Sequence, residues 1–380
     1  MIYLDSGATT LEKPPAVARA MAQAVGEMSS PGRGNYPASQ KAARTAYDCR
    51  EAAAELFHVP APEQVIFTCN ATHGLNIAIR TLVRPGCRVA VSGYEHNAVT
   101  RVLHSIPGVE IMVADAPLFR PEQTLEGFRT ALRRGVDAVI CNHVSNVFGC
   151  VQPVEELAGL CRRTHTPLIV DASQSAGILP VLLADWGAAF VAMPGHKGLY
   201  GPQGTGLLLC GAEASPLLYG GTGSASRRQT MPIDLPDRLE AGTHNMPGIA
   251  GLLEGLRFVS HAGVERIAQW ERRLTRRAEE GLARLPGVEV FADKTGQGQT
   301  GVLSFCVKGM DCEQVGEELA RRQIAVRAGL HCAPLAHRTA GTLESGTIRI
   351  SPSVFNTEGQ INFFLREMGE ILRENTKKSV

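Results

Sequence analysis

Five short apolar runs in this sequence end in polar side chains whose types suit acid–base or nucleophilic chemistry. The runs are VIFTC, RVAVS, DAVIC, PLIVD and FVAMP, and the side chains at or just after their ends include His96, Asn146, Asp171, Gln174 and Lys197. Desolvation lowers the pKa of a buried lysine and makes its amine reactive toward aldehydes. A carboxylate at the end of a buried strand, such as Asp171, needs a cationic partner. These residue types predict a site where a lysine amine condenses with an aldehyde.

The other polar groups indicate the kind of aldehyde. His96 is an imidazole suited to stacking on a planar ring. The segment NATHGLN places Thr72 at the start of an expected helix, where backbone N–H groups bind anions. A reactive lysine, a carboxylate for a ring nitrogen, a stacking ring and a phosphate-binding turn together predict a site for pyridoxal phosphate.

The elements that must position these groups follow from the apolar pattern. Between about residues 40 and 210, helical segments alternate with short continuous apolar runs, which predicts a mainly parallel α/β sheet covered on both faces. In such a sheet ligands bind beyond the carboxyl ends of the strands, where the polar groups lie. A long amphipathic helix, GVERIAQWERRLTRRAEEGLARL, then leads to strands and helices typical of a compact α+β domain. We expect a large domain at residues 17–257, a smaller one at 258–380, and an N-terminal segment, 1–16, packed near the smaller domain.

Charge and composition exclude several classes of function. The 380 residues contain 38 Lys and Arg against 37 Asp and Glu, a formal net charge of +1, so no basic field favours nucleic acid. No apolar run reaches the roughly 18 residues of a membrane span, and the N-terminus lacks a signal-peptide pattern. The ten cysteines form no CxxC pair. We expect a cytoplasmic protein that binds neither membranes nor nucleic acids.

Rival phosphate and metal motifs fail on context. The sequence has no GxxxxGK[ST] motif, which excludes a P-loop. A GxGxxG pattern at residues 296–301 lies between two expected strands and does not open a helix. His331, Cys332 and His337 lack a fourth ligand at a zinc-site spacing, so no metal is expected.

The ordered motifs resemble those of a known family. The set YLDSGATT, EHNAV, HVSNVFG, DASQSAG, GHKGLYGPQGTG, EAGTHN, VRAGLHCAPLAH and RISPSVFNT spans nearly the whole chain. It resembles the class V aminotransferase-fold enzymes, and within them the cysteine desulfurases and selenocysteine lyases. The resemblance implies the fold type I architecture of the transferases that depend on pyridoxal phosphate, with a seven-stranded sheet in the large domain, and a homodimer.

The resemblance also implies roles for individual residues. Lys197 would form the Schiff base with the cofactor, Asp171 would pair with its ring nitrogen and His96 would stack on the ring and donate protons. Thr243 would reach the phosphate from the other subunit. Arg349 would hold the substrate carboxylate with a two-pronged contact. The full set of cofactor contacts implied is Ala71, Thr72, His73, His96, Asn146, Asp171, Gln174, His196, Lys197 and Thr243, and that of substrate contacts is Asn146 and Arg349.

Cys332 matches the nucleophile of the desulfurases. Its RAGLHCAP context is polar and loop-like, where a thiolate is accessible and stabilised. The expected reaction converts L-cysteine to L-alanine, with sulfur leaving as a persulfide on Cys332 for an acceptor protein or a small thiol. Two alternatives stay open: a selenocysteine lyase or another C–S lyase of the same fold, and a non-catalytic protein that carries the cofactor or sulfur.

Three positions depart from the family pattern. Pro194 stands where relatives commonly have Ser or Thr, so an expected phosphate-binding hydroxyl is missing. Tyr36 stands where relatives often have a histidine, so a contact with the substrate is expected to differ. Gly7 replaces the usual alanine.

Overall fold

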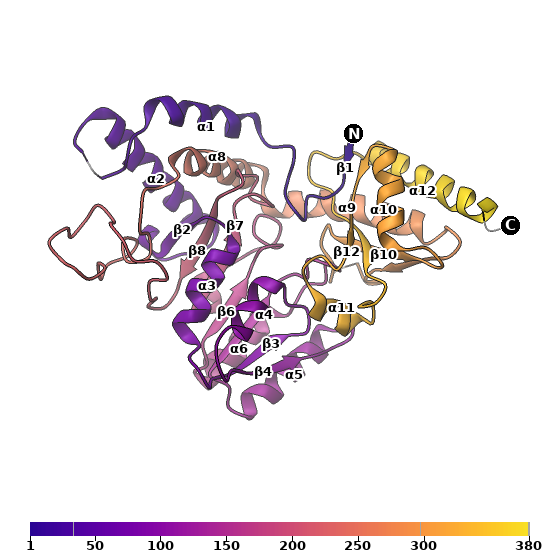
Figure 1. The fold of residues 1–380 in the computed structure, drawn as a ribbon, viewed down its shortest axis with the longest axis horizontal. Coiled ribbons are helices and arrows are strands. Elements are labelled where there is room, and N and C mark those ends of the chain that lie inside the picture. Colours follow the sequence, from indigo (N-terminus) through magenta and orange to yellow (C-terminus); the bar gives the residue numbers. More distant parts are fainter. Residues whose placement is uncertain (33, 297, 379–380) are drawn as a thin grey trace.

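The chain folds around two large sheets that lie in different parts of the molecule, and a small third sheet has two strands (Figure 1). The computed structural model describes residues 1–32, 34–296 and 298–378. Residues 33, 297, 379 and 380, which fall in the two predicted domains, lie outside this described part. The first sheet has seven strands and the second, toward the C-terminus, has four. This arrangement confirms the predicted α/β class with a mainly parallel seven-stranded sheet.

The seven-stranded sheet is parallel except at one strand. Its order is β2 (Val65–Thr68), β8 (Gly206–Cys210), β7 (Phe190–Pro194), β6 (Leu168–Asp171), β5 (Ala138–Asn142), β3 (Arg88–Ser92) and β4 (Glu110–Ala114). Strand β8 is antiparallel to both its neighbours, and every other pair is parallel. Strands β5 to β8 are buried at every residue, which explains their continuous apolar sequences.

Helices cover both faces of this sheet because successive strand side chains point to opposite sides. Within β5, Val139 packs in the core cluster that includes helices α2, α5, α6 and α8, whereas Ile140 packs in the cluster that includes α3 and α4. The helices are α1 (Pro15–Glu27), α2 (Pro37–Leu56), α3 (Ala71–Leu82), α4 (Asn97–His104), α5 (Pro121–Arg133), α6 (Val154–Thr164), α7 (Leu183–Trp186) and α8 (Met246–Ala262), with a 3₁₀ turn at Pro62–Gln64.

The smaller sheet is antiparallel, in the order β12 (Arg327–Gly329), β13 (Thr347–Ile350), β10 (Leu303–Val307) and β9 (Val288–Phe291). The helices of this region are α9 (Val264–Leu282), α10 (Cys312–Arg321), α11 (Pro334–Ala340) and α12 (Glu358–Lys378). Among the described residues, no helix combines the length and the apolarity needed to cross a membrane.

The N-terminal residues belong structurally to this second region. Strand β1 (Ile2–Tyr3) pairs in parallel with β11 (Ile324–Ala325), forming a separate two-stranded sheet. The sequence predicts one strand over IAVRAG, but the structure divides it, because β11 pairs with β1 while β12 pairs with β13. The predicted domain boundary at residue 257 falls inside α8 and stays a prediction.

Candidate active site

A cavity of about 210 Å³ lies where the carboxyl ends of β5, β6 and β7 meet the start of α3 and the loop after β12. It contains ten of the residues predicted for the site: Ala71, Thr72, His96, Asn146, Asp171, Gln174, His196, Lys197, Cys332 and Arg349. The topology therefore brings together side chains that are up to 278 positions apart in the sequence (Ala71 to Arg349). Two further predicted residues, His73 and Thr243, line a separate cavity of about 270 Å³ instead.

Lys197 follows β7 and faces the cavity beside Asp171. Burial of its ammonium lowers the pKa of Lys197 to about 8, while the negative charge of Asp171 acts in the opposite direction. Near neutral pH a fraction of the amine is therefore unprotonated and nucleophilic. The glycines around Lys197 permit close packing, since a Cβ on Gly198 would lie 2.4 Å from the carbonyl oxygen of Ala176.

Asp171, the last residue of β6, is only 4% exposed. One of its oxygens, Oδ1, accepts a hydrogen bond from the backbone N–H of Ser173 at 2.9 Å. Nearby, Gln174 donates from Nε2 to the carbonyl oxygen of Gly7 at 2.9 Å. The carboxylate is thus oriented by its own strand end, and Gln174 is held by the N-terminal segment.

His96 caps helix α4, and this contact determines the position of its proton. Its Nδ1 accepts from the backbone N–H of Ala98 at 3.0 Å. Burial, with smaller contributions from Lys197 and Arg327, lowers the pKa of His96 to about 4 even though Asp171 opposes the shift. The ring is therefore neutral at neutral pH and carries its proton on Nε2.

The start of α3 has the features of an anion-binding site. Asn70 caps the helix by accepting from the backbone N–H of His73 at 2.9 Å, so that N–H is already engaged. The N–H groups of Ala71 and Thr72 precede it in the first turn, where the helix dipole favours negative charge. His196 adds a ring nitrogen, Nδ1, that is buried and has no hydrogen-bond partner among the described residues.

Arg349 lies on β13 and is 1% exposed. Its Nη2 forms an ion pair with Asp5 Oδ1 at 2.6 Å, and its Nη1 donates to the carbonyl oxygen of Asn146 at 2.8 Å. Two polar atoms in this group, Arg349 Nε and Asn146 Oδ1, are buried without a partner in the described structure. Unpaired buried groups of this kind indicate room for a polar ligand.

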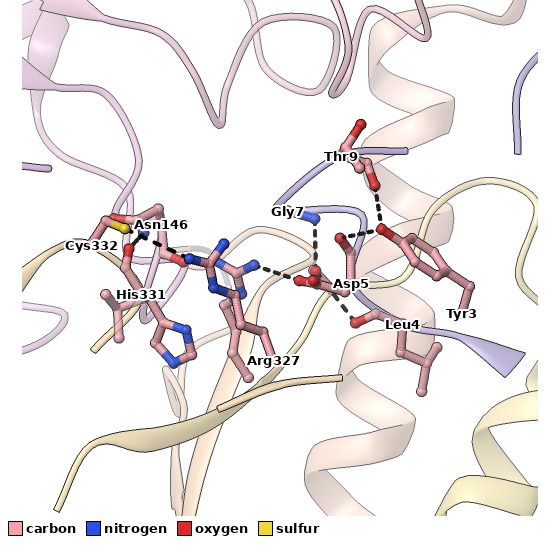
Figure 2. A network of polar contacts seen from close by, with 12 residues as sticks. Tyr3, Leu4, Asp5, Gly7, Thr9, Asn146, Arg327, His331 and Cys332 are labelled. Carbon is pink, nitrogen blue, oxygen red and sulfur yellow. Dashed lines mark hydrogen bonds and ion pairs between the residues drawn. The ribbon is translucent and has the colours of Figure 1, made fainter. Parts of the chain in front are cut away.

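Cys332 occupies a strained turn between β12 and α11. His331 and Cys332 have φ angles of 50° and 57°, in the left-handed region that few residues other than glycine adopt. The turn is held from both sides, because Asn97 N–H donates to the Cys332 carbonyl and Asn146 Nδ2 donates to the His331 carbonyl, each at 2.8 Å. The Cys332 thiol is exposed, and Arg327 Nη2 lies 3.7 Å from its sulfur (Figure 2).

Sequence reasoning missed three contributors to this site. Arg327 and His331 line the cavity, and Asp5 pairs with Arg349. Arg327 and His331 belong to the motif VRAGLHCAP, so the sequence could have indicated them. Only the cysteine of that motif was assigned a role. His331 Nε2 faces the carbonyl and hydroxyl of Thr347, and burial lowers the pKa of His331 to about 2, so its unpartnered Nδ1 is an acceptor.

The positions that depart from the family pattern lie at different depths. Pro194 lines the cavity, so the missing hydroxyl is a real difference in the lining. A Cβ at Gly7 would lie 3.0 Å from Ser351 Oγ and 3.4 Å from Arg349 Cζ, which makes this glycine a close approach to the arginine. Tyr36 is 49% exposed at the start of α2.

Comparison with known proteins decides the family. The sequence model of the class-V aminotransferase family matches residues 2–364 of this chain. This chain belongs to the class-V aminotransferase family. A probable cysteine desulfurase of Mycolicibacterium paratuberculosis is 32% identical over 98% of this chain, although the chain spans only 55% of that protein's length. A probable cysteine desulfurase of Methanothermobacter thermautotrophicus is also 32% identical, with 98% of this chain and 94% of that protein covered.

Solved structures of this class-V aminotransferase family show the same fold. The apo cysteine desulfurase of Thermococcus onnurineus superposes with a TM-score of 0.89 at 30% identity, over 98% of this chain and 95% of that one. A cysteine desulfurase of Escherichia coli in an S-sulfonic acid form gives a TM-score of 0.85 at 27% identity, over 98% and 94%. The resemblance predicted from the motifs is therefore confirmed.

Proposed function

We propose that this class-V aminotransferase is a cysteine desulfurase that depends on pyridoxal phosphate and converts L-cysteine to L-alanine with transfer of sulfur to Cys332. The observation that carries the proposal is the exposed Cys332 thiol, held on a strained turn beside Arg327 in the same cavity as Lys197. The named relatives and solved neighbours described above support the same activity.

The residues present fit pyridoxal phosphate. Lys197 supplies the amine, and Asp171, whose Oδ1 is held by the Ser173 N–H, lines the same cavity and would pair with a ring nitrogen. The unpartnered Nδ1 of His196 and the first N–H groups of α3 suit a phosphate, which compensates for the missing hydroxyl at Pro194. When bound, this cofactor supplies an electron-withdrawing ring that stabilises negative charge at the substrate Cα.

The substrate carboxylate would bind to Arg349. Its Nε is the buried, unpartnered atom of the guanidinium, and Asp5 holds the other end of the group in place. Asn146 lies beside it and connects the carboxylate site to the turn of Cys332 through its hydrogen bond to the His331 carbonyl. Arg349, Asn146 and Cys332 line one cavity, so a substrate held at Arg349 would share that cavity with the thiol.

Lys197 and His96 would move the protons. The pKa of about 8 leaves part of Lys197 neutral, so its Nζ removes the proton from the substrate Cα. His96 holds a proton on Nε2, because its Nδ1 is occupied by the cap of α4. That proton is available to the carbon that loses sulfur.

The Cys332 thiolate would attack the sulfur of the substrate. A sulfur–sulfur bond forms on Cys332 while the bond between Cβ and sulfur breaks, and its electron pair stays on the carbon. Protonation of that carbon, together with return of a proton from Lys197 Nζ to Cα, completes L-alanine. The Arg327 guanidinium lies 3.7 Å from the sulfur that makes this attack. An acceptor protein or a small thiol then removes the persulfide sulfur.

We further propose a homodimer in which Thr243 contributes to the cofactor site of the partner subunit. Thr243 is exposed and lies in the cavity that holds His73, away from the cofactor cavity of its own chain. The assignments to residues and the cytoplasmic location stay predictions.

Absorbance and product analysis test the proposal. The purified protein should show a visible band that Lys197→Ala abolishes, and L-cysteine with a thiol reductant should yield alanine and sulfide in equal amounts. We expect Cys332→Ala to lose at least about 100-fold in kcat, because nucleophilic catalysis is lost. A Cys332→Ala enzyme with full activity on L-cysteine would exclude the persulfide step. Activity of that variant restricted to L-selenocysteine would identify the lyase alternative.

A further inference from the structure

Glu95 is a buried acid immediately before His96, with no role in the reaction described above. It is 0% exposed. Its Oε1 lies 2.6 Å from the Ser92 hydroxyl and 2.8 Å from the backbone N–H of Asn142, and its Oε2 has no partner among the described residues. A buried carboxylate with so few donors is costly unless it is protonated.

The hydrogen count around Ser92 decides the charge of Glu95. The Ser92 hydroxyl has one hydrogen, yet its oxygen lies near two acceptors, Glu95 Oε1 at 2.6 Å and Asn142 Oδ1 at 2.8 Å. The amide of Asn142 cannot be turned around, because its Nδ2 already donates to the carbonyl oxygen of Tyr94 at 2.8 Å. Asn142 Oδ1 therefore needs the hydrogen of Ser92, and the contact with Glu95 needs a hydrogen from Glu95 itself.

A proton on Glu95 Oε1 satisfies every contact of this group. The acid donates to Ser92 Oγ, which also accepts from the Tyr94 N–H at 3.2 Å, and Ser92 donates to Asn142 Oδ1. The protonated Oε1 keeps a lone pair for the Asn142 N–H. An ionised Glu95 would leave two oxygens facing each other without a hydrogen.

The charged and titratable groups around Glu95 favour the same state. Asn142 is the register partner of Asp171 on the neighbouring strand β6, so a negative charge on Glu95 would add to that of Asp171. A negative charge on Glu95 would also act on the buried thiol of Cys141 on β5. Burial, reinforced by Asp171, raises the pKa of Glu95 to about 8, against the effect of its hydrogen bonds.

We propose that Glu95 is held protonated and is the positioning residue that fixes the turn carrying His96 and Asn97 to strand β5. His96 faces the cavity, and Asn97 holds the Cys332 carbonyl at 2.8 Å, so one neutral acid orients both sides of the site. Among the described residues that line the cavity, Asp171 is the one carboxylate, and a neutral Glu95 adds no second negative charge beside it. The effect on catalysis rests on the proposed function, whereas the protonation does not.

Infrared spectroscopy of the holoenzyme and of the cofactor-free protein tests the protonation. We expect a carbonyl band of a protonated carboxylic acid at neutral pH that Glu95→Gln removes. Glu271 is the matched control, because it is also buried and its pKa is likewise raised to about 8; Glu271→Gln assigns its own part of the band. An unchanged band in Glu95→Gln overturns the proposal, and a wild-type protein that binds no cofactor overturns the proposed function alone.

Comparison of two variants tests the positioning. A glutamine keeps the length and neutrality of the acid, and its nitrogen in the place of Oε1 keeps the donation to Ser92 Oγ, although it cannot accept from the Asn142 N–H. We expect Glu95→Gln to stay within about threefold of wild type in kcat, and Glu95→Ala to lose about 10- to 100-fold with a weaker visible circular dichroism band, since misplacement of about 1 Å costs this much. A Glu95→Gln variant that is folded but as impaired as Glu95→Ala shows that the charge is needed and refutes the proposal. If Glu95→Ala does not fold, the kcat and the circular dichroism of Glu95→Gln decide between the two.

Discussion

Burial moves the pKa values of the site's side chains in the direction of their neutral forms. It lowers the pKa of Lys197 to about 8 and that of His96 to about 4, and it raises the pKa of Glu95 to about 8. Each shift has desolvation as its largest cause, with Asp171 opposing it at the two bases and adding to it at the acid. The site is therefore set up for proton transfer between groups that carry little charge.

The pKa of Lys197 predicts the pH dependence of cofactor binding. Only the unprotonated amine attacks an aldehyde, and a lowered pKa means that this form dominates above about 8. The rate constant for pyridoxal phosphate binding to the cofactor-free protein should rise about tenfold per pH unit below this value and then level off. Stopped-flow absorbance measures it.

Asp171→Asn provides the control for this prediction. Asp171 raises the pKa of Lys197, so removal of its charge should move the break in the profile to lower pH. A break near the ordinary lysine pKa of 10.5 in the wild type would show that the amine is not desolvated.

Residue types at strand ends predicted most of the site, because the carboxyl ends of parallel strands meet at one edge. His96, Asp171 and Lys197 follow from this rule. The contact of Asp5 with Arg349 does not, since these residues are 344 positions apart and neither sequence neighbourhood reveals the other. The contact of Glu95 with Asn142 could not be predicted from the sequence either, because it depends on β3 and β5 being neighbours in the sheet.

At the scale of elements, the N-terminal segment connects the two halves of the site. Ile2 and Tyr3 pair with β11 of the smaller region, and Asp5 holds Arg349 on β13. Farther along, the backbone N–H of Thr10 donates to the carbonyl oxygen of His196 at 3.0 Å, next to Lys197. The segment thus contacts both the expected carboxylate site and the lysine loop.

Because Asp5 pairs with Arg349, we expect the stability of Asp5→Asn to depend more than that of wild type on a bound carboxylate ligand. Arg349 is buried and would lose its anionic partner, so the free energy of unfolding should fall by about 2 kcal/mol, less than for a fully buried pair because Asp5 is partly exposed. Saturating L-alanine supplies a carboxylate to Arg349 and should raise the melting temperature more in Asp5→Asn than in wild type. Differential scanning fluorimetry measures both shifts.

Tyr3→Phe is the matched control in the same segment. It removes the hydroxyl that lies 2.8 Å from the carbonyl oxygen of Thr9 and 3.2 Å from that of Asp5, but it keeps the Asp5 carboxylate that pairs with Arg349. Its response to L-alanine should equal that of wild type. A smaller response in Asp5→Asn than in wild type would mean that Asp5 is needed to hold Arg349 in its binding geometry.

Apolar runs predicted the strands better than they predicted the partners of each strand. The fully buried strands β5 to β8 could be recognised from the sequence, because their residues are apolar except at the strand ends. The division of IAVRAG into β11 and β12 was missed, because it depends on the arrival of β1 from the other end of the chain.

At the scale of the whole molecule, the site is built from both sheet regions. The seven-stranded sheet and its loops provide Lys197 and Asp171, and the smaller region provides Arg349 and Cys332. Thr243 stands apart from this cavity and is exposed, as a residue that serves a partner subunit would be.

Mixed dimers test the assignment of Thr243. Two different tags allow isolation of a mixed dimer of one Thr243→Ala chain and one Lys197→Ala chain. In this dimer only the Thr243→Ala chain has an intact Lys197. If Thr243 acts across the interface, that lysine site receives Thr243 from the Lys197→Ala chain and should show wild-type cofactor affinity, with about half the activity of a wild-type dimer. If Thr243 acts within its own chain, the mixed dimer should bind the cofactor as weakly as the Thr243→Ala homodimer. Cofactor titration of the three dimers distinguishes the two cases, because the Lys197→Ala homodimer forms no visible band in either.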